Sequence, residues 1–167
     1  MSRAYKALPP ASELWELFDY KPLTGELVWK NHPRYKSWTG EIAGTIDSRG
    51  YKAIEFKIDG IRHRFTGQRV VWKWVTGEDP GAHLQVDHIN QNRSDNTFSN
   101  LRLTTPEQNS HNRRHRGWVL TPAGKYRVMI GPMDTNRYVG TFDTEAEARA
   151  AYEKASKALH GEFSSVR

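Results

Sequence analysis

The fold is decided by the stretch VDHINQNRSDNTFSNLRLTTPEQN, residues 86–109. Short apolar runs at 84–89 and 101–104 predict two strands, and the polar residues between them predict a loop. The run Thr105-Pro106-Glu107-Gln108 predicts a helix start, because Thr suits the N-cap, Pro the first helical position and Gln the third. We therefore expect a strand, a loop, a second strand and a helix that runs to about Arg114.

Chemically useful side chains lie at the corners of this predicted unit. Asp87 and His88 end the first strand, Asn100 starts the second, and Asn109 lies one turn into the helix. Carboxylate and amide oxygens suit a hard cation such as Mg²⁺, and a neutral His accepts a proton near pH 7. Together they would suit phosphodiester hydrolysis. Taken singly, each residue is equally explained by turns and solvated surface.

On the residues Asp87-His88, Asn100-Leu101-Arg102 and Asn109, the sequence resembles the HNH, or ββα-metal, endonucleases. It is similar to the variant found in phage-borne homing and free-standing enzymes, in which Asn holds the third position. The resemblance implies that Asp87 and Asn109 bind one Mg²⁺ or Mn²⁺ ion. It also implies that His88 is the general base and that Asn100 orients His88.

One position departs from this pattern. Members of the family often carry His on the helix before the metal motif, and Gln68 stands there in this chain. This departure keeps a second interpretation open, in which the chain is a non-catalytic DNA-binding protein on a degenerate HNH scaffold. An RNA-binding or purely structural protein ranks last, because no RNA-binding signature is present.

Composition agrees with a polyanionic partner. The formal net charge is +6, and each phosphate neutralised by Lys or Arg releases counterions. The chain has no cysteine, which excludes disulfides and Cys-ligated zinc. The N-terminal segment MSRAYKALPPASELWELF contains no apolar run long enough for a signal peptide or a membrane span. We expect a cytoplasmic protein with no membrane partner.

The N-terminal half predicts short elements before the decisive stretch. A helix is expected over residues 9–19, capped by Ser12 and with Trp15 on its apolar face. A strand is expected in LTGELVW, and an antiparallel meander over residues 40–65, with turns at 47–50 and 59–60. A helix is expected over residues 68–76, ended by Gly77. Basic residues of the meander fit phosphate contacts or plain solvated strands equally well: Lys52, Lys57, Arg62 and Arg64.

The C-terminal part, from about residue 116, predicts a three-stranded sheet with one helix across it. The runs KYRVMI and NRYVGTF read as strands, and Thr144 caps an Ala-rich helix that Gly161 closes. Alternation places Tyr126, Val128 and Ile130 against the helix. The apolar stripe of the helix is expected to be Ala148, Ala151, Tyr152, Ala155 and Leu159, and the outward side chains Lys125, Arg127, Met129 and Tyr138.

Residues 116–163 resemble the AP2/ERF DNA-binding domain. The matching stretches are Arg116-Gly117, Gly124-Lys125-Tyr126 and residues 138–144 (YVGTFDT), followed by the Ala-rich helix. The resemblance implies that the sheet enters the major groove while the helix supports its back. Several arginines and a tryptophan of the plant pattern are replaced here, so the plant target sequence does not carry over. The alternative is an ordinary solvated sheet face.

The sequence therefore predicts an α+β chain of two domains. Residues 1–115 would form the nuclease domain, with a β-rich part at 1–80 and the ββα-metal core at 84–114, and residues 116–167 the AP2/ERF-like domain. The predicted function is metal-dependent cleavage of double-stranded DNA, as a monomer or weak dimer with no small-molecule substrate. Basic or aromatic residues are expected to touch the DNA: Arg93, Arg102, Arg113, Arg114, Arg116, Lys125, Arg127 and Tyr138.

Overall fold

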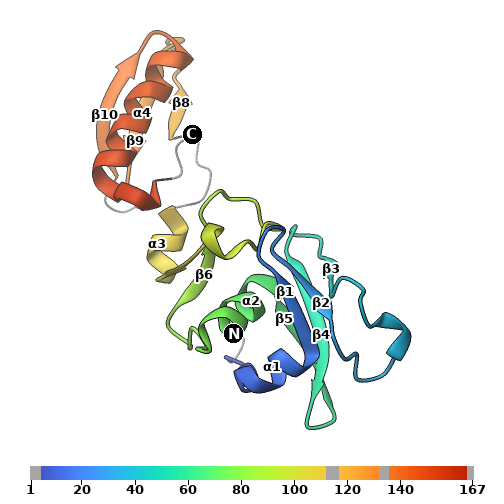
Figure 1. Cartoon of the computed structure of the whole chain (residues 1–167). Coiled ribbons are helices and arrows are strands. Elements are labelled where there is room, and N and C mark those ends of the chain that lie inside the picture. Colours follow the sequence, from blue (N-terminus) through green and yellow to red (C-terminus); the bar gives the residue numbers. More distant parts are fainter. Residues whose placement is uncertain (1–4, 112–116, 132–135, 165–167) are drawn as a thin grey trace. The chain divides into compact units, whose positions relative to one another are not determined.

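The structure, a computed structural model, describes residues 5–111, 117–131 and 136–164. The chain forms two compact units, Met1–Pro106 and Glu107–Arg167 (Figure 1). Each contains helix and antiparallel sheet, which confirms the α+β class. The predicted domain boundary at residue 115 stays a prediction, because it falls in a segment outside the described residues. Within the described ranges, no helix has the length and apolarity to cross a membrane.

The first unit is built from short elements. In chain order these are α1 (Ala11–Leu17), β1 (Phe18–Lys21), β2 (Glu26–Trp29), η1 (Lys36–Trp38), β3 (Thr45–Ile46), β4 (Lys52–Ile58), β5 (Ile61–Thr66), α2 (Gly67–Thr76), β6 (Gln85–His88), η2 (Phe98–Asn100) and β7 (Leu101–Thr104). Its antiparallel sheets are β1–β2, β3–β4–β5 and β6–β7. One residue, Thr105, separates β7 from helix α3 (Pro106–His111). The predicted meander and the strand–loop–strand–helix order after residue 84 are confirmed.

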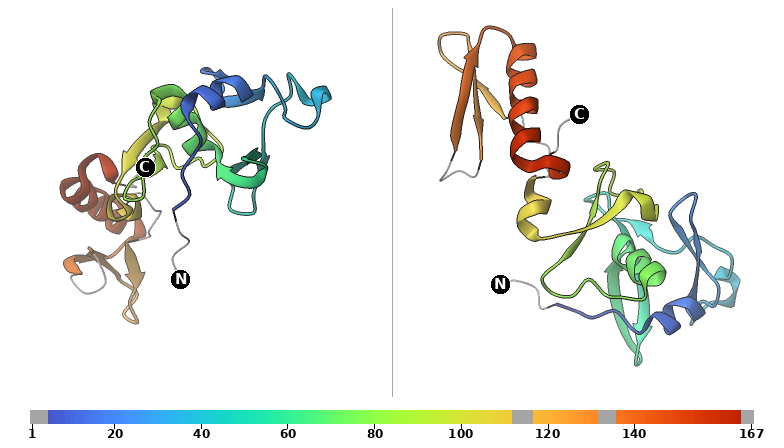
Figure 2. Two further views of the ribbon diagram at one scale, coloured as in Figure 1. Left: turned by 90° about the horizontal axis from the view of Figure 1, so that it is seen from below. Right: turned by 60° about the vertical axis from the view of Figure 1, so that its left-hand side comes forward.

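Helix α2 joins the core of the first unit to its last hairpin. It packs on β4, β5 and β6, so it lies between the meander and the β6–β7 hairpin (Figure 2). Val70 and Val71 of this helix, with Leu14, Phe18 and Ile54, are at most 1 % exposed. Burying a side chain of this kind contributes about 1.5–3 kcal/mol. Gly77 ends α2 in the left-handed conformation, with φ of 80°, as predicted.

The first helix departs from its prediction. Helix α1 begins at Ala11, after Pro10, and no side chain caps it. Ser12, the predicted cap, lies inside the helix. Trp15 is 47 % exposed and lies outside the apolar core, although its indole Nε1 donates to the Trp74 carbonyl oxygen at 2.8 Å. The predicted helix end at residue 19 was wrong, because Phe18–Lys21 pairs with Glu26–Trp29 as a hairpin. Cross-strand pairing overrides the local helical pattern here.

The second unit contains β8 (Trp118–Leu120), β9 (Tyr126–Ile130), β10 (Arg137–Phe142), α4 (Glu145–His160) and η3 (Gly161–Phe163). The sheet order is β10–β9–β8, and α4 crosses one face of it (Figure 2). Thr144 and Glu147 form the capping box that starts α4, so the predicted helix start is confirmed.

The two faces of this sheet are as the alternation predicted. Val128 and Ile130 are buried with Ala148 and Tyr152 of α4, and Tyr126 packs beside them. Arg127 and Tyr138 are exposed on the opposite face. Leu159 was wrongly assigned to the apolar stripe, because it is 46 % exposed and lies outside the core cluster of this unit.

Candidate active site

The β6–β7 hairpin carries the predicted catalytic residues. In its antiparallel register Asp87 pairs with Arg102, and His88 pairs with Leu101. Asp87 and His88 are both buried, at 8 % and 3 % exposure. Burying a carboxylate and an imidazole is costly unless each finds polar partners, so their partners define the site.

His88 is held by a residue of the loop between the two strands. Its Nε2 lies 2.9 Å from the Asn96 side-chain oxygen Oδ1. Because an amide oxygen only accepts, Nε2 donates this bond, and Nδ1 is the ring nitrogen that bears the lone pair. A side-chain partner of this kind fixes both the tautomer and the orientation of the ring.

Electrostatics keeps His88 in its neutral form near pH 7. Burial lowers the pKa of His88, and the positive charge of Arg93 acts in the same direction. The hydrogen bond to Asn96 and the charges of Asp87 and Asp95 act to raise the pKa, but the net shift is downward. A neutral imidazole is the form that accepts a proton.

Asn100 does not make the contact expected of it. Its side-chain oxygen accepts from the Asn90 amide at 2.9 Å, and its Nδ2 donates to Asn90 Oδ1 at 3.0 Å and to the Asp95 carbonyl at 2.9 Å. It therefore closes the loop from 90 to 95, and the direct contact with His88 comes from Asn96. The short helix η2 places Asn100 under the loop, whereas Asn96 lies within the loop.

Parts of the chain that are remote in sequence fix Asn96. The Tyr20 hydroxyl donates to the Asn96 carbonyl at 3.2 Å and accepts from the Phe98 amide at 2.9 Å. A Cβ atom on Gly25 would lie 2.2 Å from the Thr97 amide nitrogen, and one on Gly67 would lie 2.9 Å from Asn96 Nδ2. Glycine at both positions lets the β1–β2 turn and the start of α2 close on this segment.

From the sequence, Asn96 was predicted only as part of a polar loop. The signal that was available is weak: Asp95-Asn96 is followed by Thr97, a run typical of Asx turns. Its burial, at 3 % exposure, is what separates Asn96 from the other asparagines of the loop.

Asp87 and Arg102 form an ion pair across the hairpin. The Arg102 Nε and Nη2 atoms each lie 3.1 Å from Asp87 Oδ2. Arg102 was predicted to touch DNA, and in the structure its guanidinium orients the Asp87 carboxylate. Arg93, also predicted to touch DNA, is exposed on the loop and donates from Nη1 to the Arg49 carbonyl at 2.8 Å.

The oxygen donors at the hairpin fit a hard divalent cation. The described part of the chain holds no group of three or more His, Cys, Asp or Glu that could bind a metal. One carboxylate, from Asp87, with amide oxygens suits Mg²⁺, which keeps several waters. Asn109 lies on α3 in the second unit, and its role as a ligand stays a prediction. Gln68 is buried, and among the described residues its Oε1 has no hydrogen-bond partner.

The other predicted DNA-contact residues belong to the second unit. Lys125 forms an exposed ion pair with Asp143, at 2.9 Å between Nζ and Oδ1. The Tyr138 hydroxyl bonds Thr141 Oγ1 at 3.0 Å, on the same sheet face as Arg127. The remaining predictions of this group, Arg113, Arg114 and Arg116, lie outside the described residues.

Comparisons with known proteins match the segment that contains this hairpin. Residues 67–111 match the family model described as HNH endonuclease. An uncharacterized HNH endonuclease, L560, of Acanthamoeba polyphaga mimivirus is 32 % identical over 93 residues, which are 53 % of this chain and 49 % of that protein. The chain thus spans about half the length of this curated relative.

A solved structure of the HNH homing endonuclease I-HmuI, described for DNA binding and cleavage, is also similar. Its TM-score is 0.45 at 22 % identity, and the match covers 87 % of this chain and 88 % of that one. The matched range includes α2, the β6–β7 hairpin that carries His88, and α3. Residues 67–111 are thus similar to the HNH endonuclease family over the segment from α2 to α3.

Proposed function

We propose that this chain is a metal-dependent DNA endonuclease in which His88 is the general base. The observation that carries the proposal is the buried hydrogen bond of 2.9 Å between His88 Nε2 and Asn96 Oδ1. It leaves Nδ1 as the proton acceptor, and burial keeps the pKa of His88 low. A neutral, oriented imidazole beside a carboxylate is the arrangement that general base catalysis on a phosphodiester requires.

The residues divide the work of hydrolysis between them. His88 accepts a proton from water as the water oxygen forms a bond to phosphorus and the bond from phosphorus to the 3′ oxygen breaks; the released 3′ oxygen takes a proton from solvent water. Asn96 holds the imidazole in place, and Arg102 holds the Asp87 carboxylate. Asp87 and Asn109 would bind one Mg²⁺ or Mn²⁺ ion, which supplies positive charge to the phosphate when bound. By resemblance to the family, the products carry 5′-phosphate and 3′-hydroxyl ends, and one site per chain favours nicking.

The second unit would bind double-stranded DNA through the sheet face opposite α4. Arg127 and Tyr138 are exposed there, and Thr141 stands beside Arg127 across the β9–β10 pair. A cation, an aromatic ring and a hydroxyl suit phosphate and base contacts. The proposal also includes the likeness of this unit to AP2/ERF domains and the likeness of the nuclease part to phage-borne homing enzymes.

A second candidate function has one observation in its favour. Gln68 is buried without a partner for Oε1 among the described residues, at the position where the resembling enzymes often have His. An acceptor left unpaired costs about 1–3 kcal/mol, which fits a site that has lost a group. In this case the chain binds DNA without cutting it.

Supercoiled plasmid separates the two candidates. We expect conversion to open circles with Mg²⁺ or Mn²⁺ and none with EDTA. DNA binding that persists with no conversion under any divalent ion would favour the second candidate, and restored cleavage in Gln68→His would identify its cause.

A further inference from the structure

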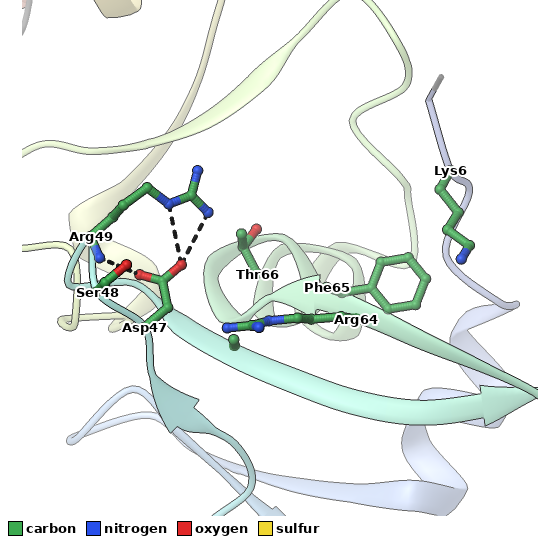
Figure 3. A pocket seen from close by; sticks show the side chains of 8 residues that line it. Lys6, Asp47, Ser48, Arg49, Arg64, Phe65 and Thr66 are labelled. Atoms are coloured by element: carbon green, nitrogen blue, oxygen red, sulfur yellow. Dashed lines mark hydrogen bonds and ion pairs between the residues drawn. The ribbon is translucent and has the colours of Figure 1, made fainter. Parts of the chain in front are cut away.

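A cavity of about 770 Å³ lies in the first unit, at the β3–β4 turn and the end of β5 (Figure 3). Its wall carries three cationic side chains, from Lys6, Arg49 and Arg64. Two hydroxyl groups and one aromatic ring complete it, from Ser48, Thr66 and Phe65. The catalytic proposal uses none of these residues.

The charge balance of this cationic cavity is positive. Its one carboxylate, Asp47, is paired with Arg49 at 3.0 Å between Oδ2 and Nη2. Arg64 lies opposite Glu55 in the strand register, but the ion pair of Glu55 is with Arg62. Within the described part of the chain, Lys6 and Arg64 have no ion-pair partner. Two uncompensated cations beside hydroxyl donors form a site for an anion.

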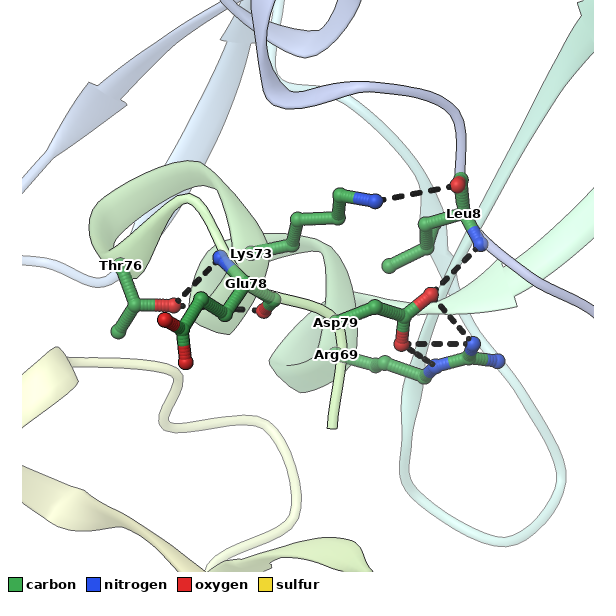
Figure 4. Close-up of polar contacts among 6 residues, drawn as sticks. All are labelled: Leu8, Arg69, Lys73, Thr76, Glu78 and Asp79. Carbon is green, nitrogen blue, oxygen red and sulfur yellow. Dashed lines mark hydrogen bonds and ion pairs between the residues drawn. The ribbon is translucent and has the colours of Figure 1, made fainter. Parts of the chain in front are cut away.

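The chain close to Lys6 is anchored at Leu8 (Figure 4). The Leu8 amide donates to Asp79 Oδ2 at 2.8 Å, and Lys73 Nζ donates to the Leu8 carbonyl at 3.1 Å. The Arg69 guanidinium is bound to the same Asp79 carboxylate at 2.8 Å. The backbone two residues after Lys6 is therefore anchored to α2 and the segment that follows it.

The residue before Lys6 is held as well. The Tyr5 ring lies under the Arg69 guanidinium, with 4.4 Å from Cζ to the ring centroid. The chain is thus held at Tyr5 and at Leu8, on either side of Lys6.

A row of side chains connects this cavity to the catalytic histidine. The guanidinium of Arg49 lies 5.6 Å from the Tyr51 ring centroid, and that of Arg93 lies 5.0 Å from it. The Tyr51 ring is in turn 6.0 Å from the His88 ring. These contacts therefore run from Arg49 in the cavity wall to the residues beside His88.

We propose that the cationic cavity binds a backbone phosphate of the DNA, and that this phosphate flanks the one that is cut beside His88. Arg64 and Lys6 contact the phosphate oxygens. The proposal rests on DNA being the substrate, and it assigns to the first unit a contact separate from the cutting step. A free mononucleotide or inorganic phosphate carries the same chemical group, and the test distinguishes these sources.

The test is binding of a fluorescent DNA duplex in EDTA, so that cleavage plays no part. Arg64→Gln and Lys6→Gln are compared with Arg62→Gln, a matched control on the same strand face that is already paired with Glu55. We expect about a tenfold rise in Kd for each cavity variant and a salt slope smaller by about one. We expect less than about a twofold change for Arg62→Gln.

Two results would overturn the proposal. One is that the cavity variants bind duplex as the Arg62→Gln control does. The other is that a deoxynucleoside monophosphate or inorganic phosphate displaces the duplex at micromolar concentration in an Arg64-dependent way, which would make the cavity a small-molecule site. The nuclease assignment can fail separately. If duplex binding depends on Arg64 but the plasmid is not cleaved, only the nuclease assignment is rejected.

Discussion

His88 and Asn96 share a hydrogen bond of 2.9 Å between two side chains that are each 3 % exposed. The bond spans eight positions of sequence, so it exists only when the loop between β6 and β7 folds back over the hairpin. From outside the hairpin, the Tyr20 hydroxyl donates to that loop, and glycine at positions 25 and 67 lets the neighbouring backbone approach it closely. The orientation of the proposed base thus depends on the N-terminal half of the first unit.

Replacing Asn96 tests this dependence. We expect Asn96→Ala to lower the cleavage rate by about 10–100-fold, because the imidazole loses its orienting partner. Asn96→Asp places a negative charge beside His88, which raises the pKa of the histidine and moves the pH–rate profile to higher pH. Asn92→Ala, in an exposed part of the same loop, is the control. Equal rates in Asn96→Ala and the control would show that Asn96 does not position the base.

Gly67 offers a test from the other side of the contact. A Cβ atom there would lie 2.9 Å from Asn96 Nδ2 and 3.0 Å from Lys52 Cβ. Alanine favours a helix over glycine by about 1 kcal/mol, so Gly67→Ala would be harmless if α2 alone mattered. We expect a loss of cleavage of about tenfold or more, with the protein still folded by circular dichroism. Unchanged kcat in Gly67→Ala would mean that Asn96 tolerates displacement.

The Asp79 carboxylate binds the Leu8 amide and the Arg69 guanidinium. Its contribution to the stability of the fold should depend on pH. Burial acts to raise the pKa of Asp79, but hydrogen bonds from Tyr5, Leu8 and Arg69 outweigh it and lower the pKa. Since the folded pKa is below the unfolded one, ionised Asp79 stabilises the fold above the usual carboxyl range. This contribution disappears as pH falls through the lowered pKa.

Asp79→Asn should therefore reduce the free energy of unfolding by about 2–3 kcal/mol at pH 7. The gap to the wild type should shrink as the pH falls below the ordinary Asp value of about 4. Denaturant unfolding at a series of pH values measures this, with Asp59→Asn in an exposed turn as the control. A gap that is constant with pH would show that the charge of Asp79 contributes nothing.

The second unit is tested by its exposed sheet face. Arg127→Gln should weaken duplex binding and reduce the salt slope by about one. Lys154→Gln, on an exposed position of α4, removes the same charge from the opposite side of the unit and should have little effect. Fluorescence anisotropy over a salt series measures both. Equal losses in the two variants would indicate a general effect of charge rather than a DNA-binding face.

The elements of the fold were mostly predictable, because local pattern and turn chemistry agree along the chain. Residues 40–65 alternate between clear turns, and Thr144 with Glu147 starts α4 as its capping box requires. Strand β1 was missed, because Phe18–Lys21 follows a helix without a break and becomes a strand only by pairing with β2. Such pairing depends on partners that a local pattern does not contain.

The candidate site was predictable in its position and less so in its contacts. Asp87 and His88 lie where the strand pattern placed them, at the end of β6. Asn96 could not be chosen among the loop asparagines, because its selection depends on Tyr20, which lies 76 positions away in sequence. The cationic cavity was likewise invisible, because it combines Lys6 with a turn and a strand that are distant in sequence.

The most direct measurement is the single-turnover rate of plasmid nicking with Mg²⁺ for the wild type, His88→Ala and His83→Ala. His83 is exposed and lies before β6, so its loss should leave the rate unchanged. Loss of the general base should lower the rate by about 10²–10⁴-fold, with duplex binding in EDTA retained. If His88→Ala nicked the plasmid as fast as His83→Ala, the assignment of His88 as the general base would be contradicted.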